Sequence, residues 1–223
     1  MNRLIPTLCV SGLLIAAGAH AANTADDIYD LANLRVKITP TLPYVDVRHH
    51  GEPVTLMRMQ DPGHTVAPRF APTGRDCPPF CVQPMKVDPD VETIGELELI
   101  AYLQRADRGE DVLVIDSRTA DWTVDGTIPG SVNIPWTRLY PDQASEAEIA
   151  DIVKFEFGAI KRDELWDFST AKTLVMFCNG AWCGQSPTNI RTLLTLGYPP
   201  EKLKWYRGGM QSWEQFGFTT VAP

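Results

Sequence analysis

The sequence has 223 residues, and its 28 acidic and 20 basic side chains give a formal net charge of −8 at pH 7. This negative charge argues against nucleic acid or an anionic membrane as the main partner, because both would repel the chain. The length is sufficient for one domain with a large core and an additional segment.

Residues 1–21 have the pattern of a secretory signal peptide. Arg3 supplies a positive charge, residues 4–17 are mostly apolar, and Ala19-His20-Ala21 is a small-x-small cleavage pattern. The apolar run is too short for a comfortable membrane span. We therefore expect a mature chain without a membrane span that is periplasmic or secreted.

Residues 22–90 are expected to form an N-terminal extension. The pattern predicts a short helix over 26–35 and a hairpin of two strands, Tyr44–Arg48 and Val54–Met59. Residues 61–89 are rich in proline, which favours a segment that wraps over a surface rather than one that builds a core.

Two cysteines of the extension, Cys77 and Cys81, enclose a Pro-Pro-Phe sequence. In an exported protein the first interpretation is a local disulfide. A zinc or copper site with His49, His50 or His64 is an alternative, because thiolate and imidazole suit both metals. Free thiols, or exchange with the second cysteine pair, form the third alternative. The pattern alone assigns no metal site and no cofactor.

From residue 91 to the end of the chain, strands and helices alternate, as is typical of α/β proteins with a parallel sheet flanked by helices. Buried strands are indicated by the continuous apolar runs at 112–115 and 174–177, and shorter strands are predicted within 128–135 and at 204–206.

Helix starts are indicated by two capping-box pairs, Thr93 with Glu96 and Ser145 with Glu148. The first helix is expected to bury Leu97, Ile100, Ala101 and Leu103. The second is expected to run to about Phe157, the third from Ser186-Pro187 to Gly197, and the last from Gly209.

The loop between residues 178 and 185 joins the strand at 174–177 to the third helix. Backbone amides at a helix start point outward and carry partial positive charge, so a cysteine held there should have a lowered pKa. Gly180 and Gly184 allow the loop amides to turn inward as an anion-binding nest. Cys178 is thus the candidate nucleophile, and the second thiol of the loop is Cys183.

Residues 91–223 resemble a rhodanese-like domain. The resemblance is carried by Val-Ile-Asp-Ser-Arg (114–118), Asp-Gly-Thr-Ile-Pro-Gly-Ser-Val-Asn-Ile-Pro (125–135), the Cys178 loop and Arg-Gly-Gly-Met-Gln-Ser-Trp (207–213). It implies a rhodanese-like sheet and a persulfide carried on Cys178. It also implies that the loop cradles the sulfur, through Asn179, Gly180, Ala181, Trp182, Gly184, Gln185 and Ser186.

The loop departs from the family pattern, because it is about two residues longer than usual and contains no Lys or Arg. Cys183 is therefore placed to attack a persulfide on Cys178 and to close a disulfide. An anionic donor would depend on loop amides together with Arg191 or Arg207. Asp116 and Arg118 are interpreted as a brace at the strand end rather than as catalytic groups.

Two neighbouring enzyme classes can be tested on the sequence. Phosphatases with a similar thiolate loop need an arginine six positions after the nucleophile, where this chain has Gly184. Trp182-Cys183-Gly184-Gln185 is similar to a thioredoxin motif, but the residues that follow match the rhodanese pattern instead. No histidine follows His64, so a Cys–His pair within this domain is excluded.

The sequence therefore predicts an exported sulfurtransferase. Its expected partners are a small donor, namely thiosulfate, a persulfide or a polysulfide, and a thiol or protein acceptor. Two alternatives remain: a thiol–disulfide exchange or metal-handling protein that uses both cysteine pairs, and a catalytically silent binding module that uses the extension.

Overall fold

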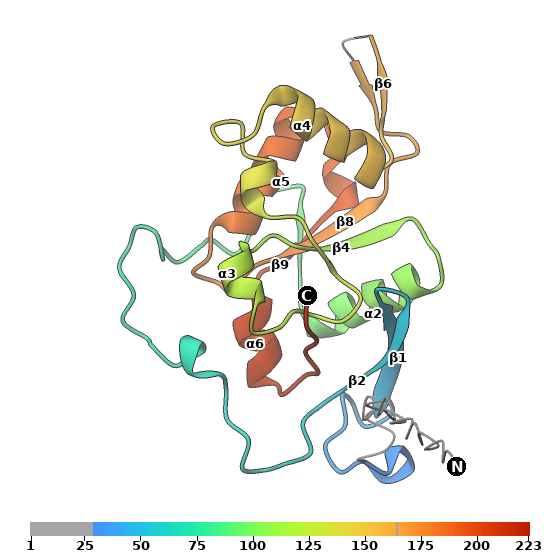
Figure 1. The fold of residues 1–223 in the computed structure, drawn as a ribbon, viewed down its shortest axis with the longest axis vertical. Helices are drawn as coiled ribbons and strands as arrows, with labels where there is room; N and C mark the ends of the chain where they lie inside the picture. The colour runs from blue at the N-terminus through green and yellow to red at the C-terminus, as the bar shows by residue number, and fades with distance from the viewer. Residues whose placement is uncertain (1–28, 164) are drawn as a thin grey trace, which may run out of the picture.

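The computed structural model describes residues 29–163 and 165–223 (Figure 1). The predicted signal peptide and the beginning of the predicted helix over 26–35 lie outside this part of the chain. Within the remainder of that prediction there is only a short 3-10 turn, η1 (Leu31–Asn33), capped by the Asp30 carboxylate. The chain leaves the helical conformation at Leu34, so the predicted helix does not extend to residue 35.

A parallel sheet forms the centre of the molecule, with strand order β3-β9-β8-β4-β5. The predicted strands are confirmed, and β3 was not predicted. The bounds are β3 (Glu92–Ile94), β4 (Val112–Asp116), β5 (Val132–Asn133), β8 (Thr173–Phe177) and β9 (Leu203–Tyr206). Asp116 is level with Phe177, and Phe177 with Tyr206, so the three central strands end at one edge.

Both faces of the sheet are covered, which explains the continuous apolar run in β8. Leu174 and Met176 belong to one core cluster, and Val175 and Phe177 belong to the other. Figure 1 shows α4 and α5 on one side of the sheet and α2 and α6 on the other. A strand buried on both faces needs apolar side chains at successive positions, unlike one with a wet face.

The helices are α2 (Glu96–Asp107), α3 (Ala120–Thr123), α4 (Glu146–Asp151), α5 (Gln185–Thr195) and α6 (Gly209–Gln215). Single turns of 3-10 helix occur at η2 (Pro68–Phe70), η3 (Trp136–Arg138) and η5 (Pro200–Lys202), and a π-helical turn at η4 (Ile152–Glu156). The Ser145–Glu148 capping box is confirmed, and α4 continues into η4 as far as the residue before Phe157.

The start predicted for the first helix was wrong. Thr93 lies in β3, opposite Trp205, so the chain is still extended there. The helix begins at Glu96, and the Glu98 carboxylate accepts a hydrogen bond from the Gly95 amide at 3.1 Å. Leu97 is consequently 50% exposed, and Leu99 takes the expected place in the core.

The predicted hairpin of the extension is confirmed as β1 (Tyr44–His49) and β2 (Glu52–Met57). Val45 and Leu56 are buried in the same cluster as Leu99 of α2 and Trp213 of α6. The hairpin therefore contributes to the core of the sheet domain. A second antiparallel hairpin, β6 (Ile160–Arg162) with β7 (Leu165–Asp167), was not predicted; in Figure 1 it projects beside α4.

None of the helices in the described part of the chain combines the length and the apolar character needed to cross a membrane.

Candidate active site in the loop after strand β8

Cys178 lies directly after β8, at the edge where the central strands end. Its side chain is only 2% exposed, and its thiol donates to the Cys183 carbonyl oxygen at 3.4 Å. The predicted position at a strand end is therefore correct, but the sulfur is enclosed by its own loop.

Ser186 has a different role from the predicted helix cap. The helix begins at Gln185, two residues earlier than predicted, with Gly184 at the N-cap position, so Ser186 lies in the first turn with its side chain fully buried. Its hydroxyl has no hydrogen-bond partner among the described residues. The amide and hydroxyl of Ser186 both contribute to lowering the pKa of the Cys178 thiol.

The loop lowers the pKa of Cys178 from the ordinary 9.0 to about 7. Burial by itself raises this pKa, because it penalises the charged form. Hydrogen bonds to the thiolate from the Cys183 thiol, from the amide and hydroxyl of Ser186 and from the Gly180 amide outweigh that effect. The lowering of the Cys178 pKa agrees with the expectation from the loop geometry.

Cys183 has the opposite electrostatics. Burial raises the pKa of its thiol well above 9.0, and the neighbouring Cys178 thiolate raises it further, because a second negative charge would be repelled. Near pH 7 the Cys178 thiol is therefore about half ionised while Cys183 stays protonated, and the Cys183 thiol donates to the Gln185 side-chain oxygen at 3.6 Å. Both are free of disulfides in this structure.

A cavity of about 330 Å³ reaches Cys183. Its aromatic wall consists of Phe80, Trp122, Trp136 and Trp182, and Asn179, Gly184 and Gln185 complete it on the loop side. Cys178 is not among its lining residues, so Cys183 stands between this cavity and the candidate nucleophile. The side-chain oxygen of Asn179 is buried and has no hydrogen-bond partner in the described part of the chain.

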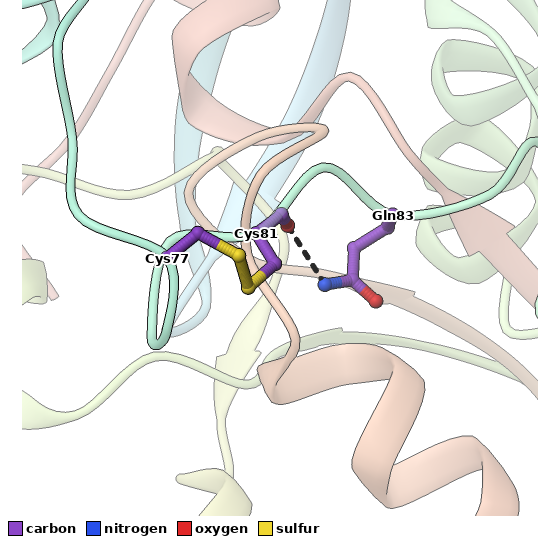
Figure 2. The surroundings of a disulfide bond; sticks show 3 residues. All are labelled: Cys77, Cys81 and Gln83. Carbon is purple, nitrogen blue, oxygen red and sulfur yellow. Dashed lines mark hydrogen bonds between the residues drawn. A yellow bond between two sulfur atoms is a disulfide. The ribbon is translucent and has the colours of Figure 1, made fainter.

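Part of the proline-rich segment, which we call the strap (residues 75–84), packs over the loop. The Gln83 amide donates to the Ala181 carbonyl at 2.8 Å, and the Arg75 guanidinium lies 4.3 Å from the ring centre of Trp182. Cys77 and Cys81 are joined as a disulfide within the strap, and the side chain of Gln83 donates to the Cys81 carbonyl (Figure 2). No local pattern in the sequence indicated that the strap would form one wall of the cavity.

Asp116 and Arg118 form a fully buried ion pair at the end of β4. The Arg118 guanidinium also donates to the carbonyls of Trp122 and Gly126, and the Thr127 hydroxyl donates to Asp116. These contacts connect the strand end to the following segment, as the interpretation of a brace requires.

Arg191 and Arg207, the two arginines suggested as partners for an anionic donor, lie in different surroundings. Arg207 donates to the carbonyls of Gln83 and Pro84 and thus holds the strap. Arg191 lies on the exposed side of α5 and lines a different cavity. Neither lines the Cys183 cavity, and their role as partners of an anionic donor stays a prediction. Arg75, which lies over the ring of Trp182 in that wall, was not among the predicted site residues.

The histidines considered for a metal site are separated from the cysteines of the strap. His49 contacts the Ala222 carbonyl and the Gly130 amide. Over residues 29–163 and 165–223, no three His, Cys, Asp or Glu side chains gather as metal ligands would.

Comparison with known proteins identifies the family to which this chain belongs. A sequence model of the rhodanese-like domain matches residues 99–216, more than half of the chain. A comparison with curated protein sequences found no match.

Among solved structures, the human single-domain sulfurtransferase TSTD1 is 23% identical, with a TM-score of 0.37 and coverage of 56% of this chain and 96% of that one. SseA from Escherichia coli, described as a 3-mercaptopyruvate sulfotransferase, is 21% identical, with a TM-score of 0.37 and coverage of 55% and 43%. A rhodanese-related protein from Thermoplasma volcanium is 20% identical, with a TM-score of 0.37 and coverage of 59% and 99%. On the family match, this chain belongs to the rhodanese-like domain family.

Proposed function

We propose that this protein is an exported sulfurtransferase that carries sulfane sulfur as a persulfide on Cys178 and passes it to a thiol or another acceptor. The observation that carries the proposal is the Cys178 thiolate at the carboxyl edge of the sheet, with its pKa lowered to about 7 by donors of its own loop. A thiolate at neutral pH is the nucleophile that sulfur transfer requires.

In the loading step, the Cys178 thiolate attacks the outer sulfur of the donor. A new S–S bond forms and the donor's S–S or S–sulfonate bond breaks, so the donor leaves as a thiolate or as sulfite. The negative charge then rests on the terminal sulfur of the persulfide. In the second step an acceptor thiolate attacks that terminal sulfur, and the Cys178 thiolate leaves.

Because Cys178 is enclosed by its own loop, we assign to Cys183 the role of controlling access to it. Because the cavity ends at Cys183, a donor has to displace the Cys183–Gln185 part of the loop to reach Cys178. Export is supported by the signal-peptide pattern and by the Cys77–Cys81 disulfide, which is of a kind that persists in oxidising compartments.

Mass spectrometry on the mature chain tests the proposal. After incubation with thiosulfate or a polysulfide, we expect one additional sulfur atom on Cys178 and none on Cys77 or Cys81. Cys178→Ser should abolish turnover, whereas Cys183→Ser should still be loaded. Continued turnover by Cys178→Ser would refute the assignment.

A second candidate, thiol–disulfide exchange, is favoured by the proximity of the two cysteines, because the Cys178 thiol donates to the Cys183 carbonyl oxygen at 3.4 Å and each thiol shifts the pKa of the other. On this route the Cys183 thiol gives its proton to the terminal sulfur of the Cys178 persulfide and attacks the inner sulfur. The bond between the two persulfide sulfurs breaks, hydrosulfide leaves and a Cys178–Cys183 disulfide closes, which an external dithiol then reduces. The same spectra distinguish the routes, because a Cys178–Cys183 disulfide would accumulate in the absence of a reductant.

A further inference from the structure

A second and larger cavity lies next to the candidate active site. It is a groove of about 630 Å³ between α4, the β6–β7 hairpin and α5. Figure 1 shows these three elements together on one side of the sheet. The floor of the groove is mainly apolar, from Ala144, Ile149, Trp166 and Leu196. The function proposed above does not use this surface.

The groove adjoins the Cys183 cavity. Thr188 lines both, and the rings of Trp136 from the Cys183 cavity and Tyr140 from the groove lie 5.3 Å apart. Along α5 the residues that line the groove recur at helical spacing, namely Thr188, Arg191, Thr192 and Thr195. This stripe extends about 10 Å along the helix. A molecule lying in the groove therefore has one end beside the cavity of Cys183.

Two cations line the groove in a protein whose formal charge is −8. Arg191 comes from α5, and Lys161 comes from β6, where it is paired with Trp166 and lies 5.7 Å from that ring centre. Among the described residues neither cation forms an ion pair, and the only carboxylate in the lining is Glu146, at the start of α4. The groove thus combines an apolar floor with a net positive rim.

The groove is partly open to solvent along its length. Its lining includes side chains that are exposed to solvent, among them Pro141, Glu146, Lys161, Arg191 and Thr195. Pockets for small ligands bury most of the ligand surface, whereas an extended segment of a larger partner needs only one of its sides covered.

We propose that this groove docks an acidic, partly apolar segment of an acceptor protein and delivers a cysteine of that segment to the Cys183 cavity. The inference rests on the proposed sulfurtransferase function, and it specifies the chemistry of the acceptor. Apolar side chains of the segment lie on Ile149 and Trp166, and its carboxylates pair with Lys161 and Arg191. The acceptor thiolate then takes the terminal sulfur of the Cys178 persulfide and releases the Cys178 thiolate.

The test uses two synthetic peptides, each with one cysteine between leucines, flanked by glutamates in one peptide and by lysines in the other. With the persulfide-loaded mature chain, we expect kcat/KM for the acidic peptide to exceed that for the basic peptide about tenfold at low salt. The double variant Lys161→Glu/Arg191→Glu should reverse this preference. A ratio between two peptides for one protein is insensitive to partial loss of folded enzyme.

The matched control is Arg162→Glu/Arg105→Glu, which changes the total charge equally. Arg162 is the hairpin neighbour of Lys161, and Arg105 lies on α2; neither lines the groove. The control should keep the preference for the acidic peptide. An unchanged preference in the groove variant, or an equal loss in the control, would overturn the docking proposal.

Mercaptosuccinate, a small thiol with two carboxylates, distinguishes docking of a protein segment from binding of a small-molecule acceptor. Docking of a segment predicts that its kcat/KM changes less than twofold between wild type and the groove variant. A change as large as that of the acidic peptide would overturn the proposal in favour of a small-molecule site. Loading of Cys178 is measured separately by mass, so failure of the sulfurtransferase function is distinguishable from failure of the docking site.

Discussion

At the scale of single residues, the two loop thiols are chemically different although they are five positions apart. Cys178 receives hydrogen bonds from Gly180, Ser186 and Cys183, and these donors favour its charged form. Cys183 is buried beside the resulting negative charge, which favours its neutral form. The loop therefore presents one nucleophile and one proton donor rather than two equivalent thiols.

This difference predicts the pH dependence of alkylation. The pKa of Cys178 is lowered, so its thiolate is present above about pH 7 and is lost as the pH falls below that value. We expect the iodoacetamide rate at Cys178, followed by peptide mapping, to rise to a plateau with a midpoint near 7. An ordinary thiol would give a midpoint near 9.0.

Cys183→Ala provides the control for this profile. It removes one donor to the thiolate, so the midpoint at Cys178 should move to higher pH. A wild-type midpoint at 8.5 or above would contradict the assignment of Cys178 as the thiolate.

At the scale of elements, the loop is held by helix α6 as well as by its own helix. The amides of Met210 and Gln211 donate to the carbonyls of Cys178 and Asn179 at 3.0 and 2.9 Å. Gly209 precedes them with φ of +57°, and a Cβ there would lie closer than 3.0 Å to backbone atoms of Cys178, Asn179 and Gly180. The Gly-Gly-Met sequence near the C-terminus thus allows two backbones to meet.

Gly209→Ala is therefore expected to destabilise the protein and to displace the loop. The positive φ alone costs about 1 kcal/mol for alanine, and the backbone overlap adds to that cost. Gly109→Ala is the matched control, because Gly109 has φ of +81° with nothing within 4 Å. In thermal unfolding we expect a loss of about 3 °C for the control and at least twice that for Gly209→Ala. Equal losses would show that the close approach has no energetic consequence.

At the scale of the whole molecule, the cavity at Cys183 is completed by a segment about 100 residues earlier in the chain. The strap contributes Phe80 to the cavity wall, and Arg207 holds the strap through the carbonyls of Gln83 and Pro84. The N-terminal extension is therefore part of the candidate site as well as part of the core.

Arg207→Ala should loosen the strap and expose the loop. We expect the alkylation rate of Cys183, measured by peptide mapping above its raised pKa, to increase about threefold to tenfold, because hydrogen bonds from a charged donor are lost. Arg58→Ala is the control, since Arg58 donates to the carbonyl of Phe216 away from the loop. An identical rate in wild type and Arg207→Ala would mean that the strap does not limit access.

The sequence by itself determined the elements that depend on local pattern. The doubly buried run of β8, the capping box of α4 and the turn at Gly197, with φ of +87°, are all specified by neighbouring residues. The position of Cys178 at a strand end followed from the same local information. These features were predictable because side-chain period and capping chemistry act over one or two turns of chain.

Only the tertiary structure decided how distant segments meet. Pairing of β3 with β9 kept Thr93 extended and moved the helix start, and packing placed Arg191 in the groove and Arg207 under the strap. Ser186 lies in the first turn of α5, where it lowers the pKa of Cys178, because the helix began two residues earlier than its cap pattern indicated. Such contacts depend on the register and packing of elements far apart in sequence, which no local pattern encodes.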